Sequence, residues 1–175
     1  MRNILIIGAG KSASYLIQYF LDKSKAENLE ITIGDLEIYN AKKWIGNHAN
    51  AKALKLDIFN KTARQQAIQN ADLVVSMLPA RFHIEVAKDC LTFRKHMVTA
   101  SYVSEEMQAL DKEAKAKNLV FLNEIGLDPG VDHMSAMQVI DRITESGGKM
   151  ILFESFTTIV GKGRLRFRRV HHNHI

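Results

Sequence analysis

The sequence predicts an α/β fold built on a doubly wound parallel sheet, and three observations support this prediction. Short runs of apolar, mostly β-branched residues recur along the chain, as expected for strands that are buried on both faces. Stretches with apolar residues at helical spacing separate these runs. The first run, residues 4–7, leads into a glycine turn and a helical pattern over residues 11–22, so strand, turn and helix follow one another directly.

Taken in order, the chain is expected to form six strands separated by five helices. The strands are residues 4–7, 30–34, 51–57, 72–76, 96–100 and 118–122. The helices are residues 11–22, 37–47, 60–69, 81–94 and one that begins after Ser104. Asn60 and Ser104 carry side chains that favour the N-cap position. A further helix over residues 132–146 and a strand over residues 149–156 follow the sheet.

Length and composition predict a single cytoplasmic domain. A chain of 175 residues with 46% apolar content can bury one core. Cys90 is the only cysteine, so no disulfide framework is possible, which points to a reducing compartment. No apolar run approaches the roughly 18 residues of a membrane span, and Met1 leads at once into a strand, so neither a membrane partner nor a signal peptide is expected.

The net charge of +5 comes from one end of the chain. Residues 157–175 hold five of the 24 Lys and Arg and no acid, which leaves 19 bases and 19 acids in residues 1–156. A neutral domain gives no electrostatic reason to expect a nucleic-acid partner.

The small residues of the first turn predict a dinucleotide-binding unit of the Rossmann type. Gly8 allows a turn that a Cβ would disfavour, Gly10 lets the backbone approach a pyrophosphate, and Ala13 lets the helix pack close to the strand. The helix start then directs free N–H groups and a positive dipole end toward the phosphates. The alternative is a glycine turn before a helix that binds nothing.

Asp35, at the end of the second strand, has two possible roles. An acid at this distance past the glycine turn can hydrogen-bond the adenosine ribose, and its charge would disfavour a 2′-phosphate, so it predicts NAD rather than NADP. The alternative is a cap for the helix that follows. Farther along, Pro79 ends the fourth strand at the edge where ligands lie in such sheets. We expect His83 and Cys90, on the next helix, to have packing or surface roles.

A second unusual segment, residues 124–133, follows the sixth strand with three acids, a histidine, two glycines and a proline. Its apolar residues, Leu127 and Val131, argue against a simple linker, so the segment is a candidate functional loop. The alternative is a structural turn with Asp132 as the N-cap of the following helix. His133 is a possible base, although a histidine just inside a helix start is as often structural.

Together, four segments resemble the saccharopine dehydrogenase family, in particular the glutamate-forming saccharopine reductases. The segments are GAGKSA (8–13), SMLPARFH (76–83), TASY (99–102) and NEIGLDPGVDH (123–133). The resemblance covers residues 1 to about 156. The carboxyspermidine and homospermidine dehydrogenases are the nearest competing class, and a non-catalytic dinucleotide-sensing module is a further alternative.

This resemblance implies a NAD- or NADP-dependent oxidation of saccharopine to glutamate and aminoadipate semialdehyde. The amino-acid substrate would contact Ser101, Tyr102 and Asp128, and either Tyr102 or Asp128 could take part in proton transfer. The positions that match the family's coenzyme contacts are Lys11, Ser12, Ala13, Asp57, Ile58, Ser76, Met77 and Leu78. No metal is implied, and a homodimer is possible.

The resemblance ends where the charge balance changes. We therefore expect a dinucleotide-binding domain over residues 1–132, the helix and first strand of a truncated substrate domain over 133–156, and a disordered or out-of-frame tail over 157–175. Alternatives for the tail are a basic arm that binds nucleic acid or membrane, or metal binding through His171, His172 and His174. An unpaired strand at 149–156 would expose Ile151 and Phe153 to self-association.

Overall fold

The computed structural model describes residues 1–161 and 164–171, with side chains through residue 154. The chain divides into one unit of Met1–Pro129 and another of Gly130–Ile175. This division falls close to the boundary that the sequence predicts after residue 132. In the described part of the chain, no helix is long and apolar enough to cross a membrane.

The first unit alternates strands and helices, and its last two helices follow one another directly. Its strands are β1 (Arg2–Ile7), β2 (Leu29–Asp35), β3 (Ala51–Lys55), β4 (Leu73–Ser76), β5 (His96–Thr99) and β6 (Phe121–Leu122). Its helices are α1 (Ser14–Ser24), α2 (Ile38–Ile45), α3 (Lys61–Gln69), α4 (His83–Phe93), α5 (Glu105–Ala109) and α6 (Asp111–Ala116). Short 3₁₀ turns, Lys11–Ala13 and Ala80–Phe82, precede α1 and α4.

The six strands form one parallel sheet in the order β3-β2-β1-β4-β5-β6. This is the doubly wound, Rossmann-like fold that the sequence predicts. The register pairs Ile7 with both Gly34 and Ser76, and Ser76 with Thr99. The segments that follow β1, β2, β4 and β5 therefore leave the sheet at one edge, beside the point where the strand order reverses between β1 and β4.

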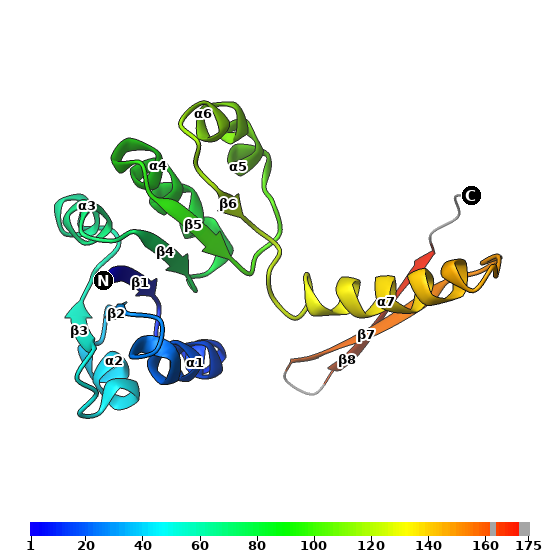
Figure 1. Ribbon diagram of the computed structural model, residues 1–175, viewed down its shortest axis with the longest axis horizontal. Helices are drawn as coiled ribbons and strands as arrows, with labels where there is room; N and C mark the ends of the chain where they lie inside the picture. The colour runs from blue at the N-terminus through cyan, green and yellow to red at the C-terminus, as the bar shows by residue number, and fades with distance from the viewer. Residues whose placement is uncertain (162–163, 172–175) are drawn as a thin grey trace. The chain divides into compact units, whose positions relative to one another are not determined.

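Two apolar cores cover the two faces of the sheet, because alternate residues of a strand point to opposite sides. Ile4 and Ile6 of β1 pack with α1 and α2 on one face. Leu5 and Ile7 pack with α3, α4 and α5 on the other face. Figure 1 shows the corresponding arrangement, with α1 and α2 on one side of the strands and α3 to α6 on the other.

Both predicted N-caps are confirmed: the Asn60 side chain accepts a hydrogen bond from the Ala63 N–H (3.1 Å), and Ser104 accepts one from the Met107 N–H (3.2 Å). The sixth strand is shorter than the predicted 118–122 and consists of two residues. It lies at the sheet edge and pairs only with β5 in the described residues, so its length is set by that single neighbour.

The second unit contains α7 (Val131–Glu145) and an antiparallel hairpin of β7 (Glu154–Gly161) and β8 (Arg164–His171). The alternative that Asp132 is the N-cap of α7 is wrong: the N-cap is Gly130, and the Asp132 carboxylate accepts a hydrogen bond from the Gly130 N–H (2.9 Å). The strand predicted over 149–156 begins at Glu154, so Ile151 and Phe153 lie outside it. The tail predicted over 157–175 includes the end of β7 and all of β8, and its residues 162–163 and 172–175 are outside the described part of the chain. The tail histidines His172 and His174 lie outside the described residues.

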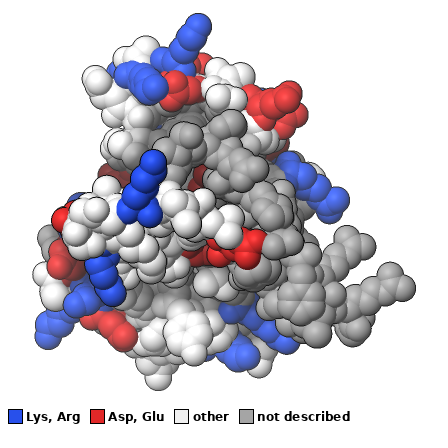
Figure 2. Space-filling model, turned by 90° about the vertical axis from the view of Figure 1, so that its right-hand side faces the viewer, with Lys and Arg blue, Asp and Glu red and all other residues white. Residues whose placement is uncertain are grey.

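Lys and Arg side chains are interspersed with Asp and Glu on the face drawn in Figure 2. Among the described residues on this face, no broad surface of one sign is visible. This mixture agrees with the equal numbers of acids and bases in residues 1–156.

Candidate functional site

The glycine turn after β1 has the geometry that its sequence predicts. Gly8 has a φ of +102°, and a Cβ added there would lie 2.9 Å from the Met77 carbonyl oxygen. A Cβ added at Gly10 would meet nothing within 4 Å. Ala13 is fully buried in the core beneath the turn. Gly8 therefore allows the turn to lie against Met77, directly after β4, whereas Gly10 faces open space into which a ligand can approach.

Lys11 and Ser12 are exposed residues of the 3₁₀ turn that opens α1. The first amides of a helix have no intrahelical acceptor and carry the positive end of its dipole. This end of α1 can hold a phosphate group of a dinucleotide.

Asp35 fixes the shape of this region through both of its carboxylate oxygens. One oxygen accepts from the Ala9 N–H (2.7 Å), and the other accepts from the Glu37 N–H and the Asn40 side-chain amide (3.0 Å each). The Trp44 indole N–H donates to the Ala9 carbonyl (3.1 Å). Asp35 is not the N-cap of α2, which is Glu37, but its hydrogen bonds connect the glycine turn to the start of that helix. A carboxylate has further lone-pair sites for a ribose hydroxyl.

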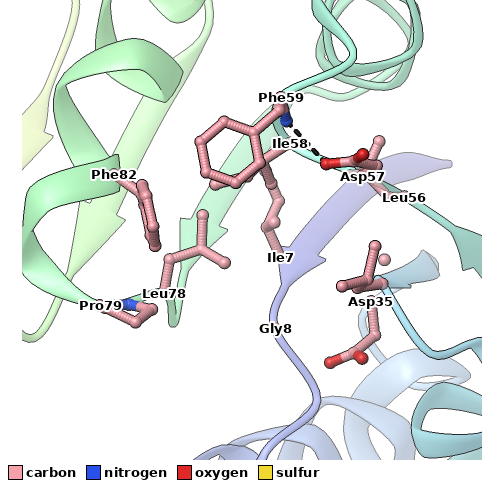
Figure 3. A pocket seen from close by; sticks show the side chains of 12 residues that line it. Ile7, Gly8, Asp35, Leu56, Asp57, Ile58, Phe59, Leu78, Pro79 and Phe82 are labelled. Atoms are coloured by element: carbon pink, nitrogen blue, oxygen red, sulfur yellow. Dashed lines mark hydrogen bonds between the residues drawn. The ribbon is translucent and has the colours of Figure 1, made fainter.

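A pocket of about 280 Å³ opens beside the turn. Its lining residues come from the ends of β1, β2, β3 and β4: Ile7, Gly8, Gly34, Asp35, Leu36, Leu56, Asp57, Ile58, Phe59, Leu78, Pro79 and Phe82. Figure 3 shows apolar side chains of Ile58, Phe59, Leu78 and Phe82 around its upper part, with Asp35 below. The rings of Phe59 and Phe82 pack edge to face, with centroids 5.3 Å apart. Such an apolar lining with two aromatic rings suits an aromatic base.

This pocket brings together five predicted site residues: Gly8, Asp35, Asp57, Ile58 and Leu78. The Asp57 carboxylate also accepts from the Phe59 N–H (2.9 Å), which holds the turn after β3 (Figure 3). Sequence reasoning missed Phe59 and Phe82, because isolated aromatic residues after a strand and before a helix give no signal of their own.

A second cluster of polar side chains lies at the ends of β4 and β5. The ring of His83 is 3% exposed and lies between two serines: Nδ1 is 2.8 Å from Ser76 Oγ, and Nε2 is 2.8 Å from Ser101 Oγ. The hydroxyl of Thr99 lies 3.0 Å from Nε2. Burial lowers the pKa of His83 below its usual value of 6.5. His83 is buried, as its packing role predicts, but sequence reasoning missed that it joins two predicted site residues.

Tyr102 and Asp128 meet across the loops that follow β5 and β6. The Tyr102 hydroxyl donates to Asp128 Oδ1 at 2.6 Å. Both side chains belong to exposed residues. They lie 26 positions apart in the chain, so the fold alone brings these two predicted site residues together.

The comparisons with known proteins decide the family of this chain. The family described as "Saccharopine dehydrogenase NADP binding domain" matches residues 4–122. The chain belongs to this family. It is a NAD(P)-binding domain of the saccharopine dehydrogenase type, as the four sequence segments indicate.

Individual relatives agree with this assignment. The glutamate-forming saccharopine dehydrogenase [NADP(+)] of Schizosaccharomyces pombe is 34% identical over 156 residues, which cover 89% of this chain. The alpha-aminoadipic semialdehyde synthase of Arabidopsis thaliana is 33% identical over 170 residues, covering 87% of this chain and 16% of that protein. The solved structure of apo saccharopine dehydrogenase (L-Glu forming) from Saccharomyces cerevisiae superposes with a TM-score of 0.76 at 30% identity, covering 90% of this chain.

This domain spans about a third of the length of the saccharopine dehydrogenases it matches, 34% of both the S. pombe protein and the S. cerevisiae chain. The names of the family and of the S. pombe relative specify NADP, so the comparisons do not support the NAD preference predicted from Asp35.

Proposed function

We propose that the chain is the coenzyme-binding part of an oxidoreductase that oxidises saccharopine to glutamate and aminoadipate semialdehyde. The observation that carries the proposal is the contact between Tyr102 and Asp128. It places a hydroxyl and a carboxylate on the loops that leave the same edge of the sheet as the glycine turn. The relatives named as saccharopine dehydrogenases supply the substrate class.

The residues present fit a dinucleotide. The open space at Gly10 leaves room for a pyrophosphate beside the first amides of α1, and the pocket between Phe59 and Leu78 leaves room for an adenine. When bound, the nicotinamide supplies the acceptor for the hydride that leaves the carbon beside the secondary amine of the substrate.

The substrate chemistry requires a group that can hold protons near that amine and near the water that later attacks. Asp128 accepts a short hydrogen bond from the Tyr102 hydroxyl. A proton can therefore pass between the two oxygens without changing the net charge of the pair. The Asp128 carboxylate also provides a negative charge that attracts the ammonium groups of an amino-acid substrate.

For the coenzyme, we propose NAD in preference to NADP, and the support is the charge of the pocket. Asp35 and Asp57 line it, and none of the residues that line it is Lys or Arg. The Arg81 guanidinium lies outside this lining, 4.7 Å from the centroid of the Phe82 ring. A 2′-phosphate placed beside these carboxylates would be repelled, and a single unfavourable contact of this kind weakens binding by about tenfold or more. The names of the relatives favour the opposite preference, so the two coenzymes must be compared directly.

Calorimetric titration of this chain with NADH and NADPH tests the coenzyme proposal. We expect tighter binding of NADH, and we expect Asp35→Asn to narrow the difference because it removes one charge. Equal or tighter binding of NADPH by the unmodified chain would contradict the proposal.

The fluorescence of bound NADH tests the substrate proposal. Saccharopine should perturb it in the unmodified chain and should do so more weakly after Tyr102→Phe or Asp128→Asn. Tyr19→Phe, which changes an exposed tyrosine on α1, is the matched control and should leave the response unchanged. A chain that binds NADH but gives no response to saccharopine would refute the substrate assignment and leave a dinucleotide-binding module.

A further inference from the structure

His83 connects the ends of two neighbouring strands inside the protein. It is the first residue of α4, and each of its ring nitrogens lies 2.8 Å from a serine hydroxyl, Ser76 at the end of β4 on one side and Ser101 after β5 on the other. The third neighbour, Thr99, also offers a hydroxyl, 3.0 Å from Nε2. The described hydrogen-bond partners of the ring are therefore all uncharged.

A neutral imidazole has one N–H donor and one acceptor nitrogen. When it lies between two hydroxyls, it donates to one and accepts from the other. The hydroxyl of Ser101 consequently cannot rotate freely, because either its lone pair or its proton is directed at Nε2. Burial lowers the pKa of His83, which keeps the ring neutral at physiological pH.

Ser101 also fixes the backbone of the loop that carries Tyr102. The Ser101 carbonyl accepts from the Glu124 N–H (3.0 Å), and the Glu124 side chain accepts from the Val103 N–H (3.1 Å). Both neighbours of Tyr102 in the chain, Ser101 and Val103, are thus hydrogen-bonded to Glu124. The Tyr102 hydroxyl reaches Asp128 from this position.

We propose that His83 is a positioning residue that fixes the Ser101 hydroxyl and, through Ser101, the loop that presents Tyr102 to Asp128. The consequence for substrate binding rests on the proposed function, whereas the consequence for the loop does not. His83 itself is buried and contacts the site through Ser101, so it acts on the geometry of the site rather than on the reacting atoms.

Native-state hydrogen exchange, measured by NMR on the full chain, tests the effect on the loop. His83→Phe keeps a planar ring and removes the hydrogen bonds to Ser76, Ser101 and Thr99. We expect the amides of Val103 and Glu124 to exchange about tenfold faster in this variant, relative to the Met97 amide, which donates to Val120 in the sheet. His83→Gln retains a donor and an acceptor and should restore part of the protection.

Val86→Ala is the matched control, since Val86 is fully buried on the same helix and has no place in the proposed site. It should destabilise the domain and raise the exchange rate of the Met97 amide, and the amides of Val103 and Glu124 should not exchange faster relative to Met97 than they do in the unmodified chain. If His83→Phe gave the same pattern as Val86→Ala, His83 would be an ordinary core residue and the inference would be wrong.

The response of bound NADH to saccharopine tests the consequence for the substrate. We expect His83→Phe and Ser101→Ala each to weaken the apparent saccharopine affinity by about three- to tenfold, and the double variant to weaken it no further. Losses that multiply in the double variant would show that His83 does not act through Ser101. If the unmodified chain gave no saccharopine response, the proposed function would fail, and the exchange measurements would still decide the role of His83 in the loop.

Discussion

Gly8 and Gly10 lie two positions apart in one turn, yet a side chain at Gly8 should lower stability and one at Gly10 should lower coenzyme affinity. Gly8 has a φ of +102°, and its added Cβ would lie 2.9 Å from the Met77 carbonyl oxygen. The backbone conformation alone costs a residue other than glycine about 1–2 kcal/mol. With the steric contact added, Gly8→Ala should destabilise the domain by at least about 2 kcal/mol, which lowers Tm by about 4–8 °C for a chain of this size.

Gly10→Val should leave stability within about 0.5 kcal/mol of the unmodified chain, because Gly10 is exposed and has an ordinary φ of −69°. Its side chain would instead occupy the open space that we assign to the pyrophosphate. We expect NADH affinity to fall by at least about tenfold, which is about 1.4 kcal/mol.

Thermal unfolding and NADH titration on the two variants separate these effects. The expected pattern is a low Tm for Gly8→Ala and a normal Tm with weak NADH binding for Gly10→Val. Normal NADH binding by Gly10→Val would show that the turn is not the coenzyme site. An unchanged Tm for Gly8→Ala would refute the argument from backbone strain.

Three further predictions concern buried groups of the domain. Because burial lowers the pKa of His83, the unfolded chain binds a proton more readily than the folded chain, so the free energy of unfolding should be highest above pH 6.5 and should fall as the pH drops below that value. Urea titrations at several pH values measure this dependence, and His83→Gln should lose part of it. Burial raises the pKa of Cys90 to about 12, so a thiol reagent should label it only after unfolding, and rapid labelling of the native protein would contradict the structure. Arg64→Ala should lower the free energy of unfolding, measured by chemical denaturation, by about 3–5 kcal/mol, because the buried Asp89 carboxylate loses its cation. In the native pair, Arg64 Nε lies 2.6 Å from Asp89 Oδ2. Lys88→Ala, which removes a surface ion pair with Glu85, should lower it by less than about 1 kcal/mol.

Local sequence patterns were sufficient for most of the first unit. Apolar runs gave the six strands, and the side chains of Asn60 and Ser104 gave two helix starts, because strand burial and helix capping depend on residues close together in the chain. The glycine turn was equally predictable. Gly8 needs the absence of a Cβ for its φ of +102°, and the absence of a Cβ at Gly10 leaves the approach to the turn open.

The same local reasoning failed where strand pairing or backbone geometry, rather than the side-chain pattern, decides the structure. The length of β6 depends on its pairing with β5, and the strand predicted at 149–156 shifts to Glu154–Gly161 because it pairs with β8. The Asp132 carboxylate suits an N-cap in isolation, yet Gly130 takes that position and Asp132 binds its N–H.

The candidate site shows the same division most clearly. The sequence by itself determined the fold class and the glycine turn, and it predicted Asp35, Tyr102 and Asp128 as site residues. Only the tertiary structure decided that Asp35 accepts from Ala9, that Tyr102 reaches Asp128, and that His83 joins Ser76 to Ser101. The physical reason is that a motif specifies which chemical groups are present near a strand end, whereas hydrogen bonds between loops depend on the packing of strands and helices that are far apart in the chain.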